Sequence, residues 1–397
     1  MNKKRILILH HGTGLGGGLI ALLGLIDDLK KQHDVDVFCV FDGEAVDYIK
    51  KKGVNVYFPQ ARFFQKYNLF IHSAASYASF LSSIKSVYYF FLFLLNSIFF
   101  ASRELSKFNG KYDILYLNSL FITDWLPFAK KYFSKVVVHV REPLYNGVIG
   151  IRKFLIRFLL KKYADLIICV SEDNKNRINI PSKSVRVYDP VVNSDRGNSS
   201  LQLPKDDLKY FVYVGGSQRI KGFEQLVKSL DFLDENVRIY FLGNTYELVE
   251  DSNKINFKIR SLFSPYLRKV LPTIKKKIYE SKNIIFIGKT NDVFDYYGKA
   301  LAILCPFSKP HACLPILESY SIGKPVIVSN VEGMEELYDK KFAKMFENND
   351  YKDFAVKINE LSKLPLSDIE RMGEDAKSFY LELTKNNPEV NVLVANI

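Results

Sequence analysis

The feature of this sequence that most limits its fold is an alternation of short apolar runs with helix-like segments, which occurs twice. Alternation of this kind predicts parallel α/β sheets. In the first half we expect strands at 5–10, 35–41, 54–58, 114–117, 135–140 and 166–170. In the second half we expect them at 210–214, 237–242, 284–287, 302–305 and 325–328, followed by a helix over 366–383.

The polar, turn-rich stretch 193–206 has no periodicity and is interpreted as a linker. At 397 residues the chain is long for a single core, so we expect two domains. The N-terminal domain is expected at 1–192 and the C-terminal domain at 207–397. The last helix is a candidate to cross back to the N-terminal domain. Both are expected to be Rossmann-like doubly wound parallel sheets that face each other across a ligand-binding cleft.

The composition of the chain limits the classes of partner that it is expected to bind. The net charge of +13 and pI near 9.2 favour anionic partners such as nucleotide phosphates or acidic lipids. Nucleic acid is not expected, because the charge is spread along the chain and no nucleic-acid motif is present. The four cysteines form no C-x-x-C pair, and three lie in strand-like runs, so we expect buried thiols in a reducing compartment and no metal site. The basic start precedes too few apolar residues for a secretory signal, which favours a cytoplasmic location.

The first strand runs into a glycine-rich loop, His10-His-Gly-Thr-Gly-Leu-Gly-Gly-Gly18. Gly12, Gly14 and Gly17 fit the spacing of a dinucleotide fingerprint, but Asp42 follows Gly12 by thirty residues, whereas that fingerprint places its acid after about 20. Three interpretations remain open. The loop could bind a nicotinamide dinucleotide, hold an anion or acceptor on helix-start amides, or form a purely structural turn.

Two stretches of the second half carry groups suited to a nucleotide. In Tyr213-Val-Gly-Gly-Ser-Gln-Arg-Ile-Lys-Gly222 a strand enters a glycine turn that Arg219 and Lys221 follow, so both cations could reach a phosphate. In 303–329 a strand and loop precede a helix expected to open near Pro315, with Glu318 in its first turn. Helix-start amides suit phosphate, and a carboxylate suits ribose hydroxyls. The alternatives are a solvated basic loop and a carboxylate that only stabilises the helix dipole.

Together with the turn at 331–337, these stretches resemble the nucleotide-sugar domain of family-4 glycosyltransferases. These are retaining enzymes of the GT-B architecture, in which two Rossmann-like domains face each other. The resemblance extends to 112–118 (YDILYLN), 136–142 (VVVHVRE) and 164–171 (ADLIICVS), and covers roughly residues 5–340. The match rests on the combination of segments, since no single motif suffices.

The resemblance implies roles for individual residues. Lys221 would neutralise the donor diphosphate with help from Arg219, and Glu318 would bind the ribose. His139 would contact the transferred sugar. Backbone amides near four residues would approach phosphate: Gly16, Gly17, Gly216 and Leu314.

The sequence departs from the family pattern at two places. The first glutamate of the family's E-x7-E motif falls at Pro310, and His311 is the candidate replacement. Where the family has Gly-Arg after the first strand of the second domain, this chain has Gly215-Gly216, so Arg219 would have to substitute.

The resemblance implies a hexosyl transfer without metal or cofactor, in which the nucleotide-sugar is a substrate. A UDP-sugar is the favoured donor, and guanosine stays open. The expected acceptor is a saccharide. The favoured candidates are polyprenol-linked saccharides of capsule, O-antigen or lipopolysaccharide assembly. Two alternatives follow from Pro310 and from the architecture: a catalytically weak sugar-binding protein, and a GT-B epimerase or phosphorylase.

Two segments suggest contact with a membrane. Residues 84–101 are long and apolar enough to be weighed as a span, against a buried or membrane-surface helix. Residues 151–163 combine apolar pairs with five cations, as in helices that lie on anionic lipid, or as in a core-facing helix with a solvated basic edge. We therefore expect peripheral attachment to the inner face of the cell membrane.

Overall fold

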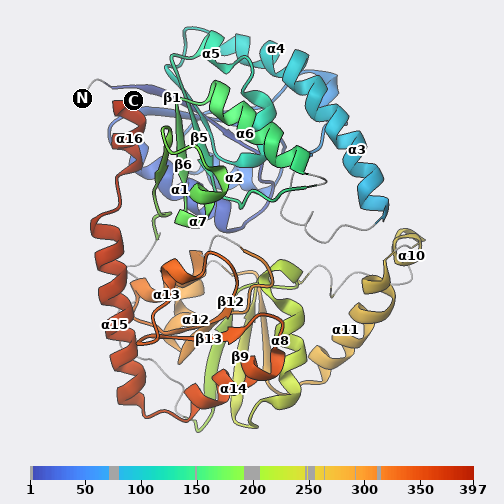
Figure 1. Ribbon diagram of the computed structural model, residues 1–397, viewed down its shortest axis with the longest axis vertical. Coiled ribbons are helices and arrows are strands. Elements are labelled where there is room, and N and C mark those ends of the chain that lie inside the picture. Colours follow the sequence, from blue (N-terminus) through green and yellow to red (C-terminus); the bar gives the residue numbers. More distant parts are fainter. Residues whose placement is uncertain are drawn as a thin grey trace. The chain divides into compact units, whose positions relative to one another are not determined.

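The computed structural model describes residues 3–70, 80–147, 150–191, 206–245, 248, 255–262, 264–290, 292–310 and 314–397. It divides into two compact units, Met1–Val192 with Asn387–Ile397, and Asn193–Asn386 (Figure 1). Every strand that the sequence predicts is present, with ends displaced by at most two residues. The fold class is therefore confirmed, because each unit is a Rossmann-like α/β domain built on a parallel sheet. Among the described residues, the first sheet has 7 strands and the second has 6.

The first unit contains a parallel sheet in the order β3-β2-β1-β4-β5-β6-β7. Its strands are β1 (Arg5–His10), β2 (Asp34–Cys39), β3 (Val56–Tyr57), β4 (Ile114–Leu117), β5 (Lys135–Val140), β6 (Leu166–Cys169) and β7 (Ser184–Arg186). Its helices are α1 (Gly17–Lys30), α2 (Glu44–Lys50), α3 (Phe80–Leu95), α4 (Ala101–Leu105), α5 (Ala129–Tyr132), α6 (Ile151–Tyr163), α7 (Glu172–Ile178) and α16 (Val390–Asn396). Separate apolar clusters form on the two faces of the sheet, as strands that are buried on both sides require.

The second unit contains a parallel sheet in the order β10-β9-β8-β11-β12-β13. Its strands are β8 (Lys209–Tyr213), β9 (Val237–Leu242), β10 (Ile284–Gly288), β11 (Ala302–Cys305), β12 (Val326–Asn330) and β13 (Ala343–Glu347). Its helices are α8 (Phe223–Ser229), α10 (Ile255–Leu262), α11 (Leu271–Glu280), α12 (Val293–Gly298), α13 (Leu314–Ser321), α14 (Tyr351–Ser362) and α15 (Leu366–Lys385). In both units the strand order reverses beside the first strand, between β1 and β4 and between β8 and β11.

Among the described residues, the edge strands β7 and β13 lie outside the strands that the sequence predicts, and helix α16 follows the last helix that it predicts. Helix α16 lies in the first unit, where it packs on α1. The Lys135 ammonium donates to the Val394 carbonyl over 2.8 Å. The Asn387 side chain accepts from the Tyr188 N–H over 2.9 Å and donates to its carbonyl over 3.1 Å. The chain therefore enters the first unit again just after α15 ends.

The cysteines at 39, 169 and 305 are buried in β2, β6 and β11, as the sequence predicts. Burial raises the pKa of Cys39 and Cys169 to about 12, so both thiols stay protonated and unreactive at neutral pH. Cys313 lies outside the described residues.

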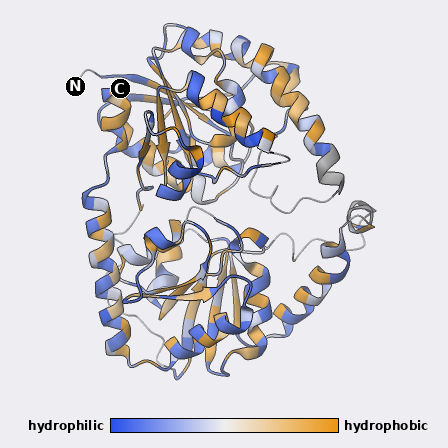
Figure 2. Ribbon diagram, viewed as in Figure 1, coloured by the Kyte–Doolittle hydropathy of each residue, from blue (hydrophilic) through white to orange (hydrophobic). Residues whose placement is uncertain are grey.

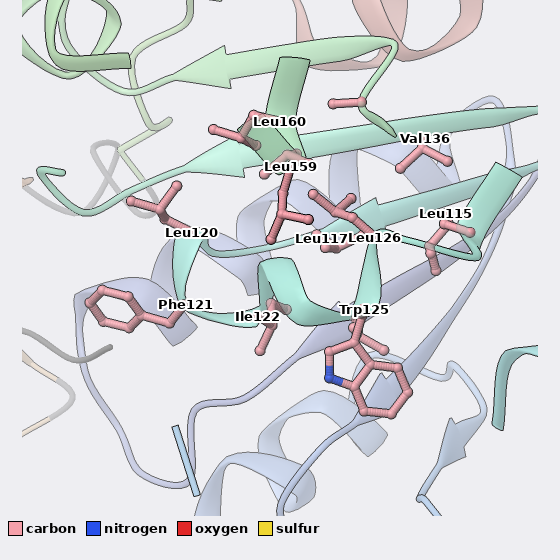
Figure 3. Packing of buried hydrophobic residues seen from close by; sticks show 14 of the residues in the cluster. Leu115, Leu117, Leu120, Phe121, Ile122, Trp125, Leu126, Val136, Leu159 and Leu160 are labelled. Atoms are coloured by element: carbon pink, nitrogen blue, oxygen red, sulfur yellow. The ribbon is translucent and has the colours of Figure 1, made fainter. Parts of the chain in front are cut away.

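The apolar segment of the first unit packs along one side. Within the described chain, Lys85–Phe108 is long and apolar enough to cross a membrane, judged by length and composition alone. Yet Phe93, Ala101 and Leu105 are buried in the same core cluster as Trp125. Figure 3 shows that cluster, with Leu159 and Leu160 of α6 close to Leu117 and Leu120. One side of this helical segment therefore belongs to the domain core.

A buried carboxylate connects the apolar segment to the turn that follows β4. Asp124, in the turn η5 (Leu120–Trp125), accepts hydrogen bonds from the Tyr67 hydroxyl over 2.6 Å and from the Asn96 amide over 2.7 Å. Asn96 begins the π-turn η3 (Asn96–Phe100), which interrupts the apolar helix. Burial raises the pKa of Asp124 to about 7, with both hydrogen bonds acting in the opposite direction.

We expect Asp124→Asn to stabilise the first unit increasingly as pH rises. Because the folded pKa of Asp124 lies above its unfolded value, ionisation destabilises the wild-type fold between about pH 4 and pH 7. Asparagine keeps an oxygen acceptor for both donors and carries no charge. The difference in unfolding free energy should grow across that range to at most about 4 kcal/mol and then stay constant.

Urea unfolding followed by fluorescence measures this difference, because Trp125 is the one tryptophan of the chain and is fully buried beside Asp124. Asn96→Asp provides the contrast, since it adds a second acid to the same network and should destabilise the unit. A difference that does not change with pH would contradict the buried-charge account.

Candidate functional site

In the second unit the loop after β8 is fixed by close backbone contacts. Gly216 has φ +54°, its N–H donates to the Leu242 carbonyl over 2.9 Å, and a Cβ there would lie 2.4 Å from the Asn244 oxygen. Gly222 has φ +84°, and a Cβ there would lie 1.5 Å from the Pro306 oxygen. Only glycine fits both positions. The β8 loop is therefore packed directly against the loops that follow β9 and β11.

Two further hydrogen bonds tie the β8 loop to the β11 loop. The Ser308 N–H donates to the Ile220 carbonyl over 3.1 Å, and the Ser308 hydroxyl donates to the Arg219 carbonyl over 2.8 Å. Between them the turn η8 (Arg219–Lys221) leads directly into α8. The backbone that carries both predicted phosphate-binding cations is therefore held at the switch point of the sheet, where ligands of such folds bind.

The two cations have different surroundings. The Arg219 guanidinium forms an ion pair with Glu224 and stacks 3.9 Å from the centre of the Tyr266 ring. The Lys221 ammonium lies 5.2 Å from the centre of the Phe307 ring, and its charge lowers the pKa of Glu318. The charge of Lys221 therefore acts on Glu318, although 97 positions separate the two residues in the sequence.

Glu318 is a buried acid in helix α13. The Tyr297 hydroxyl, from α12, donates to its Oε2 atom over 3.1 Å. Burial raises the pKa of Glu318 to about 7, while the Tyr297 hydrogen bond and the Lys221 charge act to lower it. The helix begins at Leu314, so Glu318 is its fifth residue, and the prediction that it lies in the first turn is wrong. The surroundings that act on this carboxylate are its burial and its hydrogen bond with Tyr297 of α12, rather than the dipole at the start of α13.

Two other predicted residues can be placed only in part. Leu314 is the first described residue of α13 and is half-buried. His311, the proposed replacement for the glutamate missing at Pro310, lies outside the described residues. The segment 331–337 contains the predicted turn, at 332–333, but it is followed by the short 3₁₀ helix η11 (Glu335–Leu337) and not by the start of a regular α-helix.

In the first unit the glycine-rich loop joins β1 to α1. Gly16 is the N-cap of α1 in an extended conformation, with no side-chain cap, and its carbonyl accepts from the Leu19 N–H over 2.9 Å. The amides of Gly17 and Gly18 precede the first helical hydrogen bond, as the geometry of helix starts requires. The loop also packs on the next one, since the Ala45 N–H donates to the Thr13 carbonyl over 3.1 Å. Asp42 accepts from the adjacent Gly43 N–H over 2.8 Å.

A buried polar network lies at the carboxyl ends of β1, β4 and β5. Arg141 donates from Nε to Asn118 over 2.9 Å and forms an ion pair with Asp189. Asn118 is 3.2 Å from the Nδ1 atom of His10. Burial lowers the pKa of His10 to about 3, with further lowering by the charge of Arg141, so this ring is neutral at physiological pH. The Nε2 atom of His10 and the Nη2 atom of Arg141 are buried with no partner among the described atoms.

His139 lies in β5 and is buried in the same network. Its Nδ1 atom is 2.6 Å from the Tyr116 hydroxyl, and its Nε2 atom is 3.8 Å from the Asp189 carboxylate. Burial holds the pKa of His139 well below its usual value. The ring is therefore neutral, and a sugar contact by His139 stays a prediction.

Several polar residues of these two sites were not singled out from the sequence. Arg141 could have been found, because it directly follows a predicted strand and strand ends point at ligands in this fold class. Asp189 and Tyr297 stand in no motif, and only the folded chain brings them to His139 and Glu318. In the described part of the chain, no group of three or more His, Cys, Asp or Glu side chains could hold a metal ion.

Comparison with known proteins bears on the second unit. Residues 198–379 match the family model of glycosyl transferases group 1. The chain carries a group 1 glycosyltransferase domain. This domain contains the β8 loop with Lys221 and the helix α13 with Glu318. No curated protein sequence matches the chain.

Several solved structures share the fold of this chain at low sequence identity. Anabaena Alr3699/HepE in complex with UDP and glucose has a TM-score of 0.70 at 14% identity, covering 98% of this chain and 97% of that one. A glycosyltransferase from Rickettsia africae has a TM-score of 0.66 at 18% identity, covering 100% of both chains. The lipopolysaccharide outer core galactosyltransferase WaaB has a TM-score of 0.58 at 15% identity, covering 96% of this chain and 98% of that one. The likeness confirms the GT-B architecture.

We expect Gly222→Ala to destabilise the second unit by at least about 2 kcal/mol, through its positive φ and its contact with Pro306. Gly298→Ala is the matched control, because Gly298 ends helix α12 with open space around it. It should be neutral or slightly stabilising. Calorimetric thermal unfolding measures both variants. Equal melting temperatures for the two would contradict the tight contact between the β8 and β11 loops.

Proposed function

We propose that this chain is a retaining glycosyltransferase that moves a sugar from a UDP-sugar to a saccharide acceptor. The observation that carries the proposal is a buried carboxylate, Glu318, which accepts from Tyr297 and on which the charge of Lys221 acts, beside the β8–β11 switch point of a group 1 glycosyltransferase domain. A cation beside a carboxylate matches the phosphate and ribose of one nucleoside diphosphate. The neighbour Alr3699/HepE, solved with UDP-glucose, supports uridine as the base.

Lys221 would stabilise the negative charge that develops on the leaving diphosphate. The backbone amide near Leu314 would add a hydrogen bond to a phosphate oxygen, whereas the Gly216 N–H is already engaged with the Leu242 carbonyl. Arg219 would assist, with its guanidinium oriented by Glu224 and Tyr266. These groups supply the charge that a divalent metal supplies elsewhere, so we propose a metal-independent reaction without a cofactor.

Retention of configuration would follow from attack on the same face that the leaving group occupies. A double displacement needs a carboxylate nucleophile beside the anomeric carbon. Glu142 is a poor candidate, because its two oxygens accept from the Ser119 hydroxyl over 2.8 Å and the Leu120 N–H over 3.1 Å. In the proposed front-face route the leaving phosphate takes the proton of the acceptor hydroxyl as the glycosidic bond forms.

For the acceptor we propose a polyprenol-linked saccharide in cytoplasmic assembly of a surface polysaccharide. The likeness to a lipopolysaccharide outer core galactosyltransferase and the apolar side chains exposed on the first unit support this choice. The substitution of Pro310 for the usual glutamate favours one second candidate, a protein that binds the donor with little turnover. Turnover against a panel of lipid-linked acceptors separates the two.

Calorimetric titration with UDP, GDP, ADP and NAD tests the donor site. We expect UDP to bind and Glu318→Ala to weaken it by about 1–3 kcal/mol, because the ribose hydroxyls lose their acceptor. Glu360→Ala, which removes an exposed carboxylate of α14, is the control and should leave UDP affinity unchanged. Binding of NAD in place of UDP would overturn the proposed function and restore the dinucleotide interpretation of the glycine-rich loop.

The pH dependence of UDP affinity tests the state of Glu318. The ionised carboxylate accepts more hydrogen bonds than the acid, so affinity should fall as pH drops below about 7. Tyr297→Phe removes a hydrogen bond that lowers the pKa of Glu318, so the midpoint should move to higher pH. Tyr296→Phe, next to it on α12, is the matched control. The phosphate's own titration is common to all variants, and a midpoint that Tyr297→Phe leaves unchanged would contradict the assignment.

A further inference from the structure

Helix α6 of the first unit exposes an apolar stripe. Ile151, Phe154 and Phe158 are 58%, 74% and 48% exposed, and their spacing of three and four residues places them on one face. The opposite face, with Ile156, is buried in the core cluster. Side chains of this size normally turn inward in a protein of this kind. We therefore expect a binding partner to cover this stripe.

The apolar segment beside it shows the same division. Val87, Phe91 and Phe99 are 70%, 56% and 61% exposed, whereas Phe93 is buried. In Figure 2 the ribbon of α3 is apolar along most of its described length. An exposed apolar stripe therefore extends from α3 into η3.

One aromatic ring joins the two helices. The Arg152 guanidinium, at the start of α6, lies 5.4 Å from the centre of the Phe70 ring. The same ring lies 5.0 Å from the ring of Phe90 and 5.7 Å from that of Phe93, both in α3. Helices α3 and α6 therefore share one aromatic contact within the same domain. We call the following exposed side chains the α3–α6 surface: Val87, Tyr88, Phe91, Ile98, Phe99, Ile151, Phe154 and Phe158.

The charge on this surface has a single sign. Helix α6 contains five cations and no acidic residue, and 80–100 contains Lys85 as its only charged residue. The Lys162 ammonium lies 5.5 Å from the centre of the Phe158 ring, so one of these cations lies directly against the aromatic stripe. Exposed aromatic rings flanked by Lys and Arg are typical of helices that lie in the lipid interface.

We propose that the α3–α6 surface docks on an anionic lipid bilayer, with its aromatic side chains in the interface and the α6 cations on the headgroups. A bilayer fits better than a protein partner, because lysine is depleted at protein interfaces and no acidic residue balances the five cations. A transmembrane arrangement is excluded by the buried side of the same segment, where Asn96 bonds to Asp124. The segment thus lies on the membrane as part of a folded domain.

This inference stands apart from the donor site, which lies in the other unit. It deepens the proposed function in one respect, since a bilayer would present a polyprenol-linked acceptor at the protein surface. This link to the acceptor rests on the proposed function. The two can fail separately, because lipid binding and UDP binding are measured on different ligands.

Co-sedimentation with vesicles tests the proposal with the full-length chain. The vesicles are of phosphatidylcholine alone, and of phosphatidylcholine mixed with phosphatidylglycerol. We expect the partition coefficient to be about tenfold or more higher on the anionic vesicles, and to fall as salt screens the headgroups. Phe154→Ser/Phe158→Ser should lower it about tenfold or more, and Lys161→Glu/Lys162→Glu should do the same on anionic vesicles only.

Matched variants in the second unit serve as controls. Leu366→Ser/Leu381→Ser removes two apolar side chains of α15 that are 48% and 57% exposed, and Lys340→Glu/Lys341→Glu reverses two exposed lysines. Both should bind vesicles as the wild type does. Calorimetry with UDP on every variant shows that the donor site is intact.

Three outcomes would overturn the proposal: no sedimentation with anionic vesicles, equal loss for surface and control variants, or a monomer produced by Phe154→Ser/Phe158→Ser from a wild-type dimer that ignores lipid. The last result would assign the surface to a second copy of this chain. UDP binding retained alongside any of them would leave the proposed function standing.

Discussion

The contact between two loops at the carboxyl edge of the second sheet determines the geometry of the candidate donor site. Gly222 lies so close to the Pro306 carbonyl that no side chain fits, and Ser308 adds hydrogen bonds to the same turn. Because β8 and β11 are adjacent parallel strands, their loops leave the sheet at the same edge. This contact fixes the backbone that carries Lys221, and so places a cation near Glu318 without any direct link in the sequence.

Three buried acids illustrate how burial alone does not identify a functional group. Burial raises the pKa of Asp124, Glu142 and Glu318 to about 7 in each case. Asp124 and Glu142 receive hydrogen bonds from neighbours in their own domain core, which explains them as structural anchors. Glu318 differs in the origin of the cation that acts on it: Lys221 comes from the separate loop after β8, whereas the cation that acts on Glu142 is its chain neighbour Arg141. The surroundings of the acid, rather than its pKa, favour a binding role.

Much of the fold could be predicted from the sequence because buried parallel strands are continuous apolar runs, as 135–140 and 302–305 show. Strands β7 and β13 were missed because both are only partly buried and so lack a continuous apolar run, and β7 has only 3 residues. The position of Glu318 was misjudged by part of a turn, since Pro315 suggested a helix start that lies at Leu314. Tyr297 and Asp189 had no signal, because their partners are distant in sequence.

The sequence by itself determined the parallel sheets, the glycine-rich turns after the first strand of each domain, and the identity of the groups suited to a nucleotide. These features are local, since they depend on apolar periodicity and on glycines at strand ends. Only the tertiary structure decided that Lys221 acts on Glu318, that Tyr297 donates to that carboxylate, and that the final helix returns to the first unit. It also decided which side of the apolar segment is buried, because a side chain's surroundings are set by packing between elements that the sequence keeps far apart.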